Sequence, residues 1–342
     1  MPKTVLLTGA SGYIAKYIAL HLLDAGYSVR GTVRSLSRGA EVIEAVRPHL
    51  GDASNLEARL TFVELDLGRD DGWDAAMEGV DVLMHTASPF PLTQPKDEAA
   101  LIRPAVDGTL RALRAAHRAG VTRVVLTSST AAITGSDLPA GDTSYDETNW
   151  TDPDTPGLTA YTKSKTLAEK AAWDFVTNDA PAMQMTVINP GFVLGAPLDR
   201  HFGTSIAVIE RLVNAKDPML PDVGFTAVDI RDVAALHVTV IDKPQTVGQR
   251  IMAVENFLKF ADMAQAIKTA FPRRKTVTRV APDIVIRLLG LFDPAVRSIV
   301  PNLGRVDKFD NSRAKATLGR GMHQSRNAVV DAARYLIENK PA

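Results

Sequence analysis

The chain contains no cysteine among its 342 residues. Disulfide bonds, thiol catalysis and thiolate metal sites are therefore excluded. The sequence also lacks an excess of either charge, since 39 basic and 39 acidic residues give a formal net charge of +0 at pH 7. Such a balance provides no general attraction to nucleic acid or to anionic membranes. We therefore expect neither of them as a partner.

Long apolar runs are also missing. The run that follows Lys3 is interrupted by Gly9 and Gly12, which does not fit a signal peptide. The stretch Ile284–Phe292 contains Arg287 and is too short to span a bilayer. This composition suits a cytoplasmic protein. The length exceeds that of one simple core, which predicts a large domain with a smaller second lobe.

Strand and helix patterns alternate along the first half of the chain. This alternation predicts an α/β fold, in which a doubly wound parallel sheet carries helices on both faces. The predicted strands are Thr4–Leu7, Ser28–Val33, Leu60–Glu64, Val80–His85, Arg123–Ser128 and Met185–Asn189, with helices from Tyr13, near Glu41–Arg47, and at Leu101–Ala119 and Tyr161–Val176. Later helices are expected at Phe257–Ala270, Asp283–Leu291 and Ala328–Glu338. Ligands of such sheets bind at the carboxyl ends of the strands.

The first strand runs through a glycine turn into a helix. Gly9, Ser11 and Gly12 form the turn, with the spacing Gly9-x-x-Gly12-x-x-Ala15. A helix that begins in this way presents free N–H groups and a positive dipole end to an anion. The glycines allow the backbone to approach a pyrophosphate closely. The turn therefore predicts a dinucleotide site.

The end of the second strand indicates which nicotinamide cofactor is bound. An NAD site usually places an acid about 20 residues past the turn, on the ribose hydroxyls. Here the sequence reads Gly31-Thr32-Val33-Arg34, without an acid. Arg34 can instead form a forked, charge-assisted contact with a 2′-phosphate, assisted by Ser35 and Arg38. We expect a preference for NADPH. After the third strand, Asp66 can accept a hydrogen bond from adenine.

The fifth strand leads into a group of hydroxyl side chains. Tyr161 and Lys165 then stand four residues apart on one face of a predicted helix. A phenol has a pKa of about 10, and a neighbouring ammonium group favours the phenolate and lowers that value. A tyrosine in this position can exchange a proton near neutral pH. The hydroxyl of Ser129 can hold a substrate carbonyl oxygen beside it, and Lys165 can bind the nicotinamide ribose.

These residues resemble the short-chain dehydrogenase/reductases of the extended type. Within that family the chain is most similar to the group of dihydroflavonol reductases, cinnamoyl-CoA reductases and microbial ketone or aldehyde reductases. The resemblance covers nearly the whole chain. The matching stretches are Thr8–Ala15, Leu65–Leu67, His85–Pro89, Thr127–Ser129, Tyr161–Lys165, Asn189–Gly195, Val228–Ala234 and Phe309–Gly319, with Val33-Arg34 and Asp146-Glu147-x-x-Trp150.

The resemblance implies a role for each matching residue. Ser129, Tyr161 and Lys165 would be the catalytic residues, with Tyr161 as the proton donor in carbonyl reduction. The phosphates of NADPH would be bound by the glycine turn and Arg34, and adenine by Asp66 and Leu67. The implied cofactor-binding residues are Gly9, Ser11, Gly12, Tyr13, Ile14, Arg34, Arg38, Asp66, Leu67, Thr86, Ala87, Ser88, Thr127, Tyr161, Lys165, Pro190 and Val193.

The resemblance also implies a Rossmann sheet whose mostly helical C-terminal lobe covers the substrate. Residues 1–190 and about 226–254 would form the NADP-binding domain, and residues 191–225 and 255–342 the substrate lobe. Phe90, Thr130, Thr134 and Phe192 would line the substrate pocket. Plant dihydroflavonol reductases often carry Asn or Asp where this chain has Thr134. That departure favours a microbial ketone or aldehyde reductase over a flavonoid reductase.

Two other functions fit parts of this pattern. A sugar-nucleotide epimerase or dehydratase of the same superfamily would retain NAD, but the acid expected after the second strand is missing. A non-catalytic NADP-binding sensor would typically lack the Tyr161 and Lys165 pair, which is present here. No histidine lies in a metal-ligand spacing, so no metal site is predicted. The chain is expected to be a monomer or a homodimer.

Overall fold

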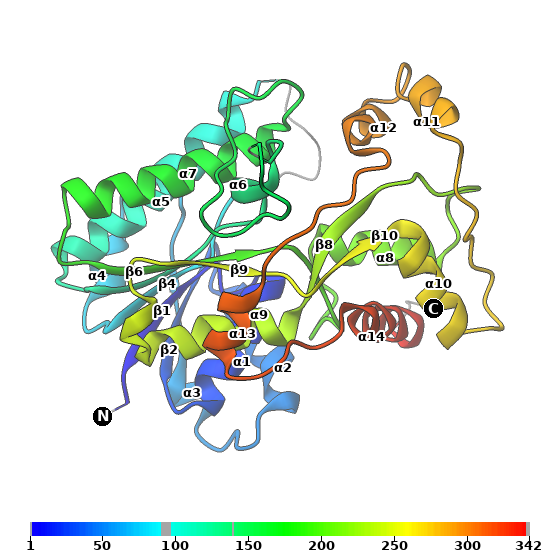
Figure 1. Cartoon of the computed structure of the whole chain (residues 1–342). Helices are drawn as coiled ribbons and strands as arrows, with labels where there is room; N and C mark the ends of the chain where they lie inside the picture. Colours follow the sequence, from blue (N-terminus) through cyan, green and yellow to red (C-terminus); the bar gives the residue numbers. More distant parts are fainter. Residues whose placement is uncertain (1, 90–96, 139, 340–342) are drawn as a thin grey trace.

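A computed structural model of the protein describes residues 2–89, 97–138 and 140–339. Within these residues, seven parallel strands form one sheet in the order β3-β2-β1-β4-β5-β6-β9 (Figure 1). The strands are β1 (Thr4–Thr8), β2 (Ser28–Val33), β3 (Leu60–Glu64), β4 (Val82–His85), β5 (Arg123–Thr127), β6 (Gln184–Pro190) and β9 (Arg250–Ala253). This order is that of a Rossmann sheet extended by one strand, and it confirms the predicted fold class.

Helices cover both faces of the sheet because its strands are apolar on both sides. Val5 and Leu7 of β1 face one layer, whereas Leu6 faces the other. The first layer contains α1 (Tyr13–Asp24), α2 (Ser37–Val46) and α9 (Ile230–Thr239). The second contains α4 (Trp73–Met77), α5 (Ala99–Arg118) and α7 (Ala160–Asn178). Figure 1 shows α5 and α7 side by side above the sheet.

A second, smaller sheet lies beside the first. Within the described chain it contains three strands in the order β10-β8-β7, from β7 (Phe192–Leu194), β8 (Gly224–Asp229) and β10 (Asn256–Lys259). It packs against α14 (Ser325–Glu338), and α8 (Thr204–Val213) and α10 (Phe260–Ala270) complete this part (Figure 1). The sequence did not predict this sheet. The division of the chain into two domains stays a prediction.

Two predicted elements need correction. The helix expected over Phe257–Ala270 begins only at Phe260, because the preceding residues pair with β8 as β10. The helix expected near Glu41–Arg47 begins earlier, since α2 already starts at Ser37. Gly39 lies inside this helix, where the Phe62 ring leaves room for glycine because a Cβ would come within 2.7 Å of it.

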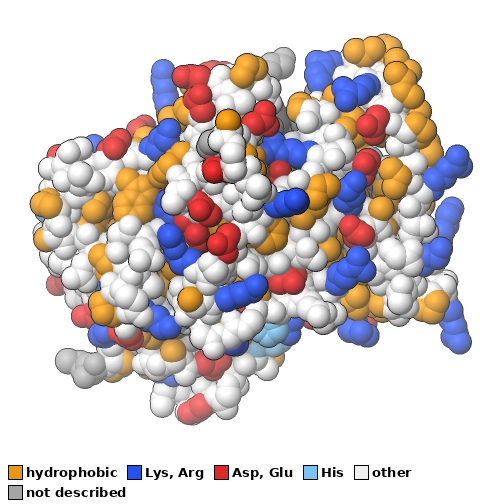
Figure 2. Space-filling model, in the orientation of Figure 1, with side chains coloured by type: hydrophobic (Ala, Val, Ile, Leu, Met, Phe, Trp, Pro, Cys, Tyr) orange, Lys and Arg blue, Asp and Glu red, His pale blue; other side chains and the backbone are white. Residues whose placement is uncertain are grey.

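Several short elements were not predicted, namely α3 (Leu56–Arg59), α6 (Ala131–Thr134), α12 (Pro294–Ile299) and α13 (Ser312–Leu318). The predicted helix α11 (Asp283–Leu289) stands apart from the sheets together with α12 (Figure 1). Apolar side chains gather over this corner in Figure 2, where Ile284 and Phe292 are 62% and 85% exposed. No helix in the described ranges has the length and apolar character that crossing a membrane requires.

Candidate active site

The glycine turn follows β1 at the edge where the parallel strands end. Gly12 is the N-cap residue of α1, and among the described side chains none caps this helix. The N–H groups of its first turn have no partner within the helix, because the hydrogen bond that Lys16 donates to the Gly12 carbonyl is the first along it. Gly9 has a φ of +67°, and a Cβ there would lie 3.0 Å from the Ala87 Cβ. The turn is thus open to an anion and held close to the end of β4.

Thr8 and His85 order the segment that follows β4. The Thr8 hydroxyl oxygen accepts hydrogen bonds from the backbone N–H groups of Thr86 and Ala87, both at 3.0 Å. It therefore donates its own proton to Nδ1 of His85, at 2.9 Å. His85 is buried, and this burial lowers its pKa to about 3, with the charge of Lys165 acting in the same direction. The predicted cofactor residues Thr86, Ala87 and Ser88 are half-buried beside the glycine turn.

The predicted phosphate-binding arginines differ in their surroundings. Arg34 is exposed after β2, and no hydrogen bond or ion pair to another described residue holds its guanidinium. Arg38 instead lies 3.0 Å from the Glu41 carboxylate and 3.3 Å from Nε2 of His201. Arg34 therefore offers the freer charge. Asp66 is exposed after β3, where its carboxylate accepts a hydrogen bond from the Gly68 N–H at 2.7 Å.

Tyr161 and Lys165 lie on the first two turns of α7. The helix begins there because the Thr159 hydroxyl caps it by accepting a hydrogen bond from the Thr162 N–H at 3.1 Å. Nζ of Lys165 lies 6.0 Å from the centre of the Tyr161 ring. The Ser129 side chain hydrogen-bonds the Tyr161 side chain from the loop after β5. The three predicted catalytic residues are thus brought together at the edge that carries the glycine turn.

Burial governs the protonation of this group. It raises the pKa of Tyr161, and the hydrogen bond with Ser129 opposes that effect only in part. The expected lowering of the Tyr161 pKa by Lys165 is therefore wrong. Burial also lowers the pKa of Lys165 to about 8, while the charge of Glu169 acts in the opposite direction.

The remaining predicted residues lie near the same edge with different exposure. Thr127 is half-buried, and its hydroxyl lies 2.8 Å from Nε2 of His237 on the opposite face of the sheet from α7. Thr130 is buried, with its hydroxyl 3.4 Å from that of Thr226. Phe192 stacks on Phe225, with ring centres 4.8 Å apart. Of the others, Leu67, Thr134, Ser11 and Ile14 are half-buried, Tyr13, Pro190 and Val193 are buried, and Phe90 lies outside the described residues.

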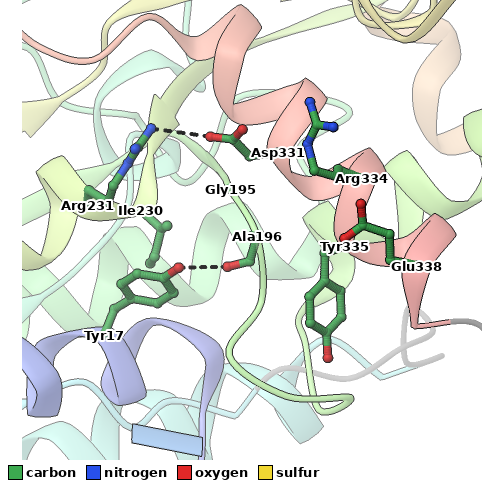
Figure 3. A pocket seen from close by; sticks show the side chains of 9 residues that line it. All are labelled: Tyr17, Gly195, Ala196, Ile230, Arg231, Asp331, Arg334, Tyr335 and Glu338. Atoms are coloured by element: carbon green, nitrogen blue, oxygen red, sulfur yellow. Dashed lines mark hydrogen bonds and ion pairs between the residues drawn. The ribbon is translucent and has the colours of Figure 1, made fainter. Parts of the chain in front are cut away.

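Two cavities lie near these residues. One of about 450 Å³ is lined by Tyr145 and Arg305, and Arg305 donates a hydrogen bond to the Thr134 carbonyl at 2.8 Å. It is therefore adjacent to a predicted substrate residue. The other, of about 240 Å³, lies between α1, α9 and α14 (Figure 3). Beside it the Tyr17 hydroxyl donates to the Ala196 carbonyl at 2.8 Å, which fixes the loop after β7 to α1.

A buried ion pair beneath α7, the helix that carries Tyr161 and Lys165, was not predicted from the sequence. Glu169 and Arg250 are 1% and 6% exposed, and Nε of Arg250 lies 2.6 Å from Oε1 of Glu169. Glu169 also accepts a hydrogen bond from Asn189, at 2.7 Å. One signal was present in the sequence, because Glu169 follows Tyr161 and Lys165 at a spacing of four residues and so shares their helix face. No comparable pattern marks Arg250.

Comparisons with known proteins place the chain in a family. The model of the family described as the NAD dependent epimerase/dehydratase family matches residues 5–254. A ketoreductase from Aspergillus niger, azaE, is 34% identical over 99% of this chain and 98% of its own length. The cinnamoyl-CoA reductase CAD2 of Medicago truncatula is 34% identical over 82% of this chain and 85% of its own. Among solved structures, Gre2 of Candida albicans in complex with NADPH is 28% identical, with a TM-score of 0.79 over 99% of this chain and 100% of that one.

Proposed function

The chain belongs to the NAD-dependent epimerase/dehydratase family, and we propose that it is an NADPH-dependent reductase that transfers hydride to a ketone or aldehyde carbonyl. Similarity to reductases supports the broader statement that the protein is an NAD(P)-dependent oxidoreductase. One observation carries the proposal: Ser129, Tyr161 and Lys165 converge at the sheet edge where the open glycine turn lies. The reverse reaction, oxidation of the alcohol, uses the same groups.

The residues present fit NADPH. The uncapped first turn of α1 suits the pyrophosphate, because its N–H groups need an acceptor. The exposed guanidinium of Arg34 suits the 2′-phosphate, and NADPH-bound Gre2 has the same fold. Asp66 and Leu67 would lie at the adenine, and Thr86 to Ser88 along the ribose. The bound cofactor would supply the hydride, and the protein would position it.

The chain's own residues carry the proton chemistry. Ser129 and Tyr161 would donate hydrogen bonds to the substrate carbonyl oxygen. As hydride adds to the carbonyl carbon, the C=O bond becomes a single bond and the oxygen becomes an alkoxide, which takes the proton of Tyr161. The Lys165 ammonium would stabilise the phenolate that remains, and the phenolate is reprotonated from solvent. The product is the alcohol.

The substrate is proposed to be a small ketone or aldehyde. Phe192 of β7 stacks on Phe225 of β8 as an apolar surface, and Thr134 ends α6, which follows the loop that carries Ser129. An aromatic surface suits an apolar carbonyl compound. Thr134 also lacks the carboxylate or amide that a hydroxylated flavonoid ring would use. The cavity beside Thr134 is more polar, since Arg305 and three other charged residues line it.

An epimerase or dehydratase remains the second candidate, because the family model carries that description. Such an enzyme would retain NAD through its cycle. The absence of an acid in Gly31–Arg34 opposes this function. Purified protein that carries tightly bound NAD and acts on a sugar nucleotide without added cofactor would favour it. A non-catalytic NADP sensor is disfavoured by the presence of both Tyr161 and Lys165.

The proposed function is tested by NADPH oxidation with a panel of carbonyl compounds. The panel contains aryl ketones, aldehydes, diketones, flavanonols and acyl-CoA thioesters. We expect turnover of ketones or aldehydes with NADPH and weaker turnover with NADH. Binding of NADPH without turnover of any compound would contradict the proposal. Product chirality, measured on a prochiral aryl ketone, then reports the face of hydride addition.

A further inference from the structure

The buried pair of Glu169 and Arg250 connects the catalytic helix to the far edge of the sheet. Glu169 lies on α7 one turn after Lys165, and Arg250 begins β9. Their contact is short, with Nε of Arg250 2.6 Å from Oε1 of Glu169. Both groups are nearly inaccessible to solvent. A charge in such a place is tolerated only when it is paired and hydrogen-bonded.

Each partner also holds a segment of the candidate active site. Oε2 of Glu169 accepts hydrogen bonds from the Ser128 hydroxyl at 2.5 Å and from Nδ2 of Asn189 at 2.7 Å. The same Asn189 nitrogen donates to the Ser129 carbonyl at 3.2 Å. The carboxylate thus fixes the backbone on both sides of the Ser129 Cα. A displaced Ser129 could not share a carbonyl oxygen with Tyr161.

Arg250 restrains the other side of the same loop. Its Nη2 donates to the Ala132 carbonyl at 3.3 Å, and its Nη1 donates to the Asn149 carbonyl at 2.6 Å. The guanidinium also stacks on the Trp150 ring, 3.7 Å from its centre. Within the described residues, the hydrogen bonds that the guanidinium donates therefore end on Glu169, on the Ala132 carbonyl or on the carbonyls of the segment before Trp150.

We propose that the buried pair of Glu169 and Arg250 positions the catalytic machinery, by fixing the Ser129 loop and by balancing the charge around Lys165. The inference concerns the same site and rests on the proposed function. Neither residue touches substrate or cofactor in this role, and both act through Ser129 and Lys165. The two partners carry opposite charges, so their removal has opposite electrostatic consequences at Lys165.

The groups that face Lys165 define this electrostatic effect. Glu169 and Tyr161 face it from its own helix, and His85 faces it from β4 as a neutral ring. Arg250 faces Glu169 from β9 and compensates its charge. On the side of α5, the exposed Glu98 pairs with Lys163 at 2.8 Å. Glu169 is therefore the anion that keeps Lys165 protonated against the effect of burial.

Removing one partner at a time shifts the titration of Lys165 in opposite directions. Glu169→Gln removes the anion and leaves the Arg250 cation uncompensated, so the pKa of Lys165 falls below about 8. Arg250→Gln leaves the Glu169 anion uncompensated, so that pKa rises. The double variant restores the balance. We expect shifts of about 1 pH unit for each single variant and a return close to the wild-type value for the double variant.

The measurement uses the protein without cofactor. The ¹³Cε resonance of Lys165 is followed against pH in protein with ¹³C-labelled lysine, and Lys165→Met identifies the signal. Ser128→Ala is the matched control, because it removes a hydrogen bond to the same carboxylate without changing charge. Its Lys165 titration should coincide with that of the wild type. Shifts in the same direction for both single variants, or no shift in either, would overturn the proposal.

A second measurement separates this inference from the proposed function. With a carbonyl substrate, the alkaline limb of kcat should move to lower pH in Glu169→Gln and to higher pH in Arg250→Gln. A protein that turns over no carbonyl compound contradicts the proposed function, whereas the titration of Lys165 still decides the inference. Should a single variant fail to fold, the double variant decides, because it leaves no unpaired buried charge. The pKa of Lys165 in the double variant must then match that of the wild type. A shifted pKa would refute the proposed charge balance between Glu169 and Arg250.

Discussion

Lys165 lies one helical turn beyond Tyr161, with its Nζ 6.0 Å from the centre of the phenol ring. The two side chains share a face of α7, and that face meets the loop that carries Ser129. Burial disfavours charge on both groups, since it raises the pKa of the phenol and lowers that of the amine. The phenol is therefore held in its protonated form, which suits a proton donor.

Replacing Tyr161 by Phe removes the proposed proton donor. We expect kcat for carbonyl reduction to fall by about 10²–10⁴-fold, the usual contribution of a positioned acid. The dissociation constant of NADPH, measured by fluorescence titration, should change by less than about threefold, because one hydrogen bond at most is lost. Tyr27→Phe is the control, since Tyr27 hydrogen-bonds Asp242 away from the site. A Tyr161→Phe variant with wild-type kcat would remove Tyr161 from the mechanism.

Replacing Arg34 by Ala tests the choice of cofactor. The loss of a charge-assisted contact with the 2′-phosphate should raise KM for NADPH by about 10- to 100-fold. KM for NADH should remain within about twofold, because NADH lacks that phosphate. Arg118→Ala removes an equal charge at an exposed pair with Asp74 and should affect neither constant. An equal rise in KM for both cofactors in Arg34→Ala would show that Arg34 does not bind the 2′-phosphate.

Replacing Gly9 by Ala tests the close approach of the glycine turn to β4. A side chain at a φ of +67° is strained by about 1–3 kcal/mol, and the new Cβ would lie 3.0 Å from Ala87. We expect a loss of unfolding free energy of that size, and NADPH binding weakened about tenfold because the turn shifts. Gly51→Ala is the control, since no atom lies within 4 Å of its added Cβ. Chemical denaturation and fluorescence titration give the two quantities.

His237 should make stability depend on pH. Burial lowers its pKa from 6.5 to about 4, although its hydrogen bond with the Val233 carbonyl opposes this. Above pH 6.5 the ring is neutral in both states. Between pH 6.5 and about 4 only the unfolded chain takes up the proton. The free energy of unfolding therefore decreases as the pH is lowered through this range, by up to about 1.4 kcal/mol per pH unit from this group.

His237→Gln should remove that contribution. Its free energy of unfolding, measured in urea at several pH values, should decrease less steeply than that of the wild type as the pH is lowered from 6.5 to 4.5. The difference in slope should correspond to roughly one proton fewer taken up on unfolding. His85, whose pKa burial lowers to about 3, continues to contribute to the remaining slope. Equal slopes for variant and wild type would mean that His237 is protonated in the folded protein.

The main sheet and the grouping of Ser129, Tyr161 and Lys165 were predictable because their signals are local. Alternating apolar runs place Ser28–Val33 and Leu60–Glu64 at the bounds that the structure shows. Tyr161 and Lys165 are related by helical spacing alone. The parallel arrangement then places every strand end at one edge, so residues that are far apart in sequence meet there without further information.

The features that escaped prediction depend on contacts between distant segments. β10 forms only because Asn256–Lys259 pairs with β8, and nothing within four residues distinguishes it from a helix start. The pKa of Tyr161 depends on burial, which spacing does not reveal. Arg250 joins Glu169 across 81 positions in the chain, so no local pattern connects them.

The position of Arg250 on β9 has a consequence for synthesis of the chain. A nascent polypeptide that has emerged only as far as β6 already contains α7 and Glu169, but not the cation that neutralises this carboxylate. Burying Glu169 at that stage would leave a charge without a counterpart, which is strongly unfavourable. We therefore expect α7 to dock in its final position only after β9 leaves the ribosome, so that the residues of the candidate site come together late in translation rather than with the first six strands.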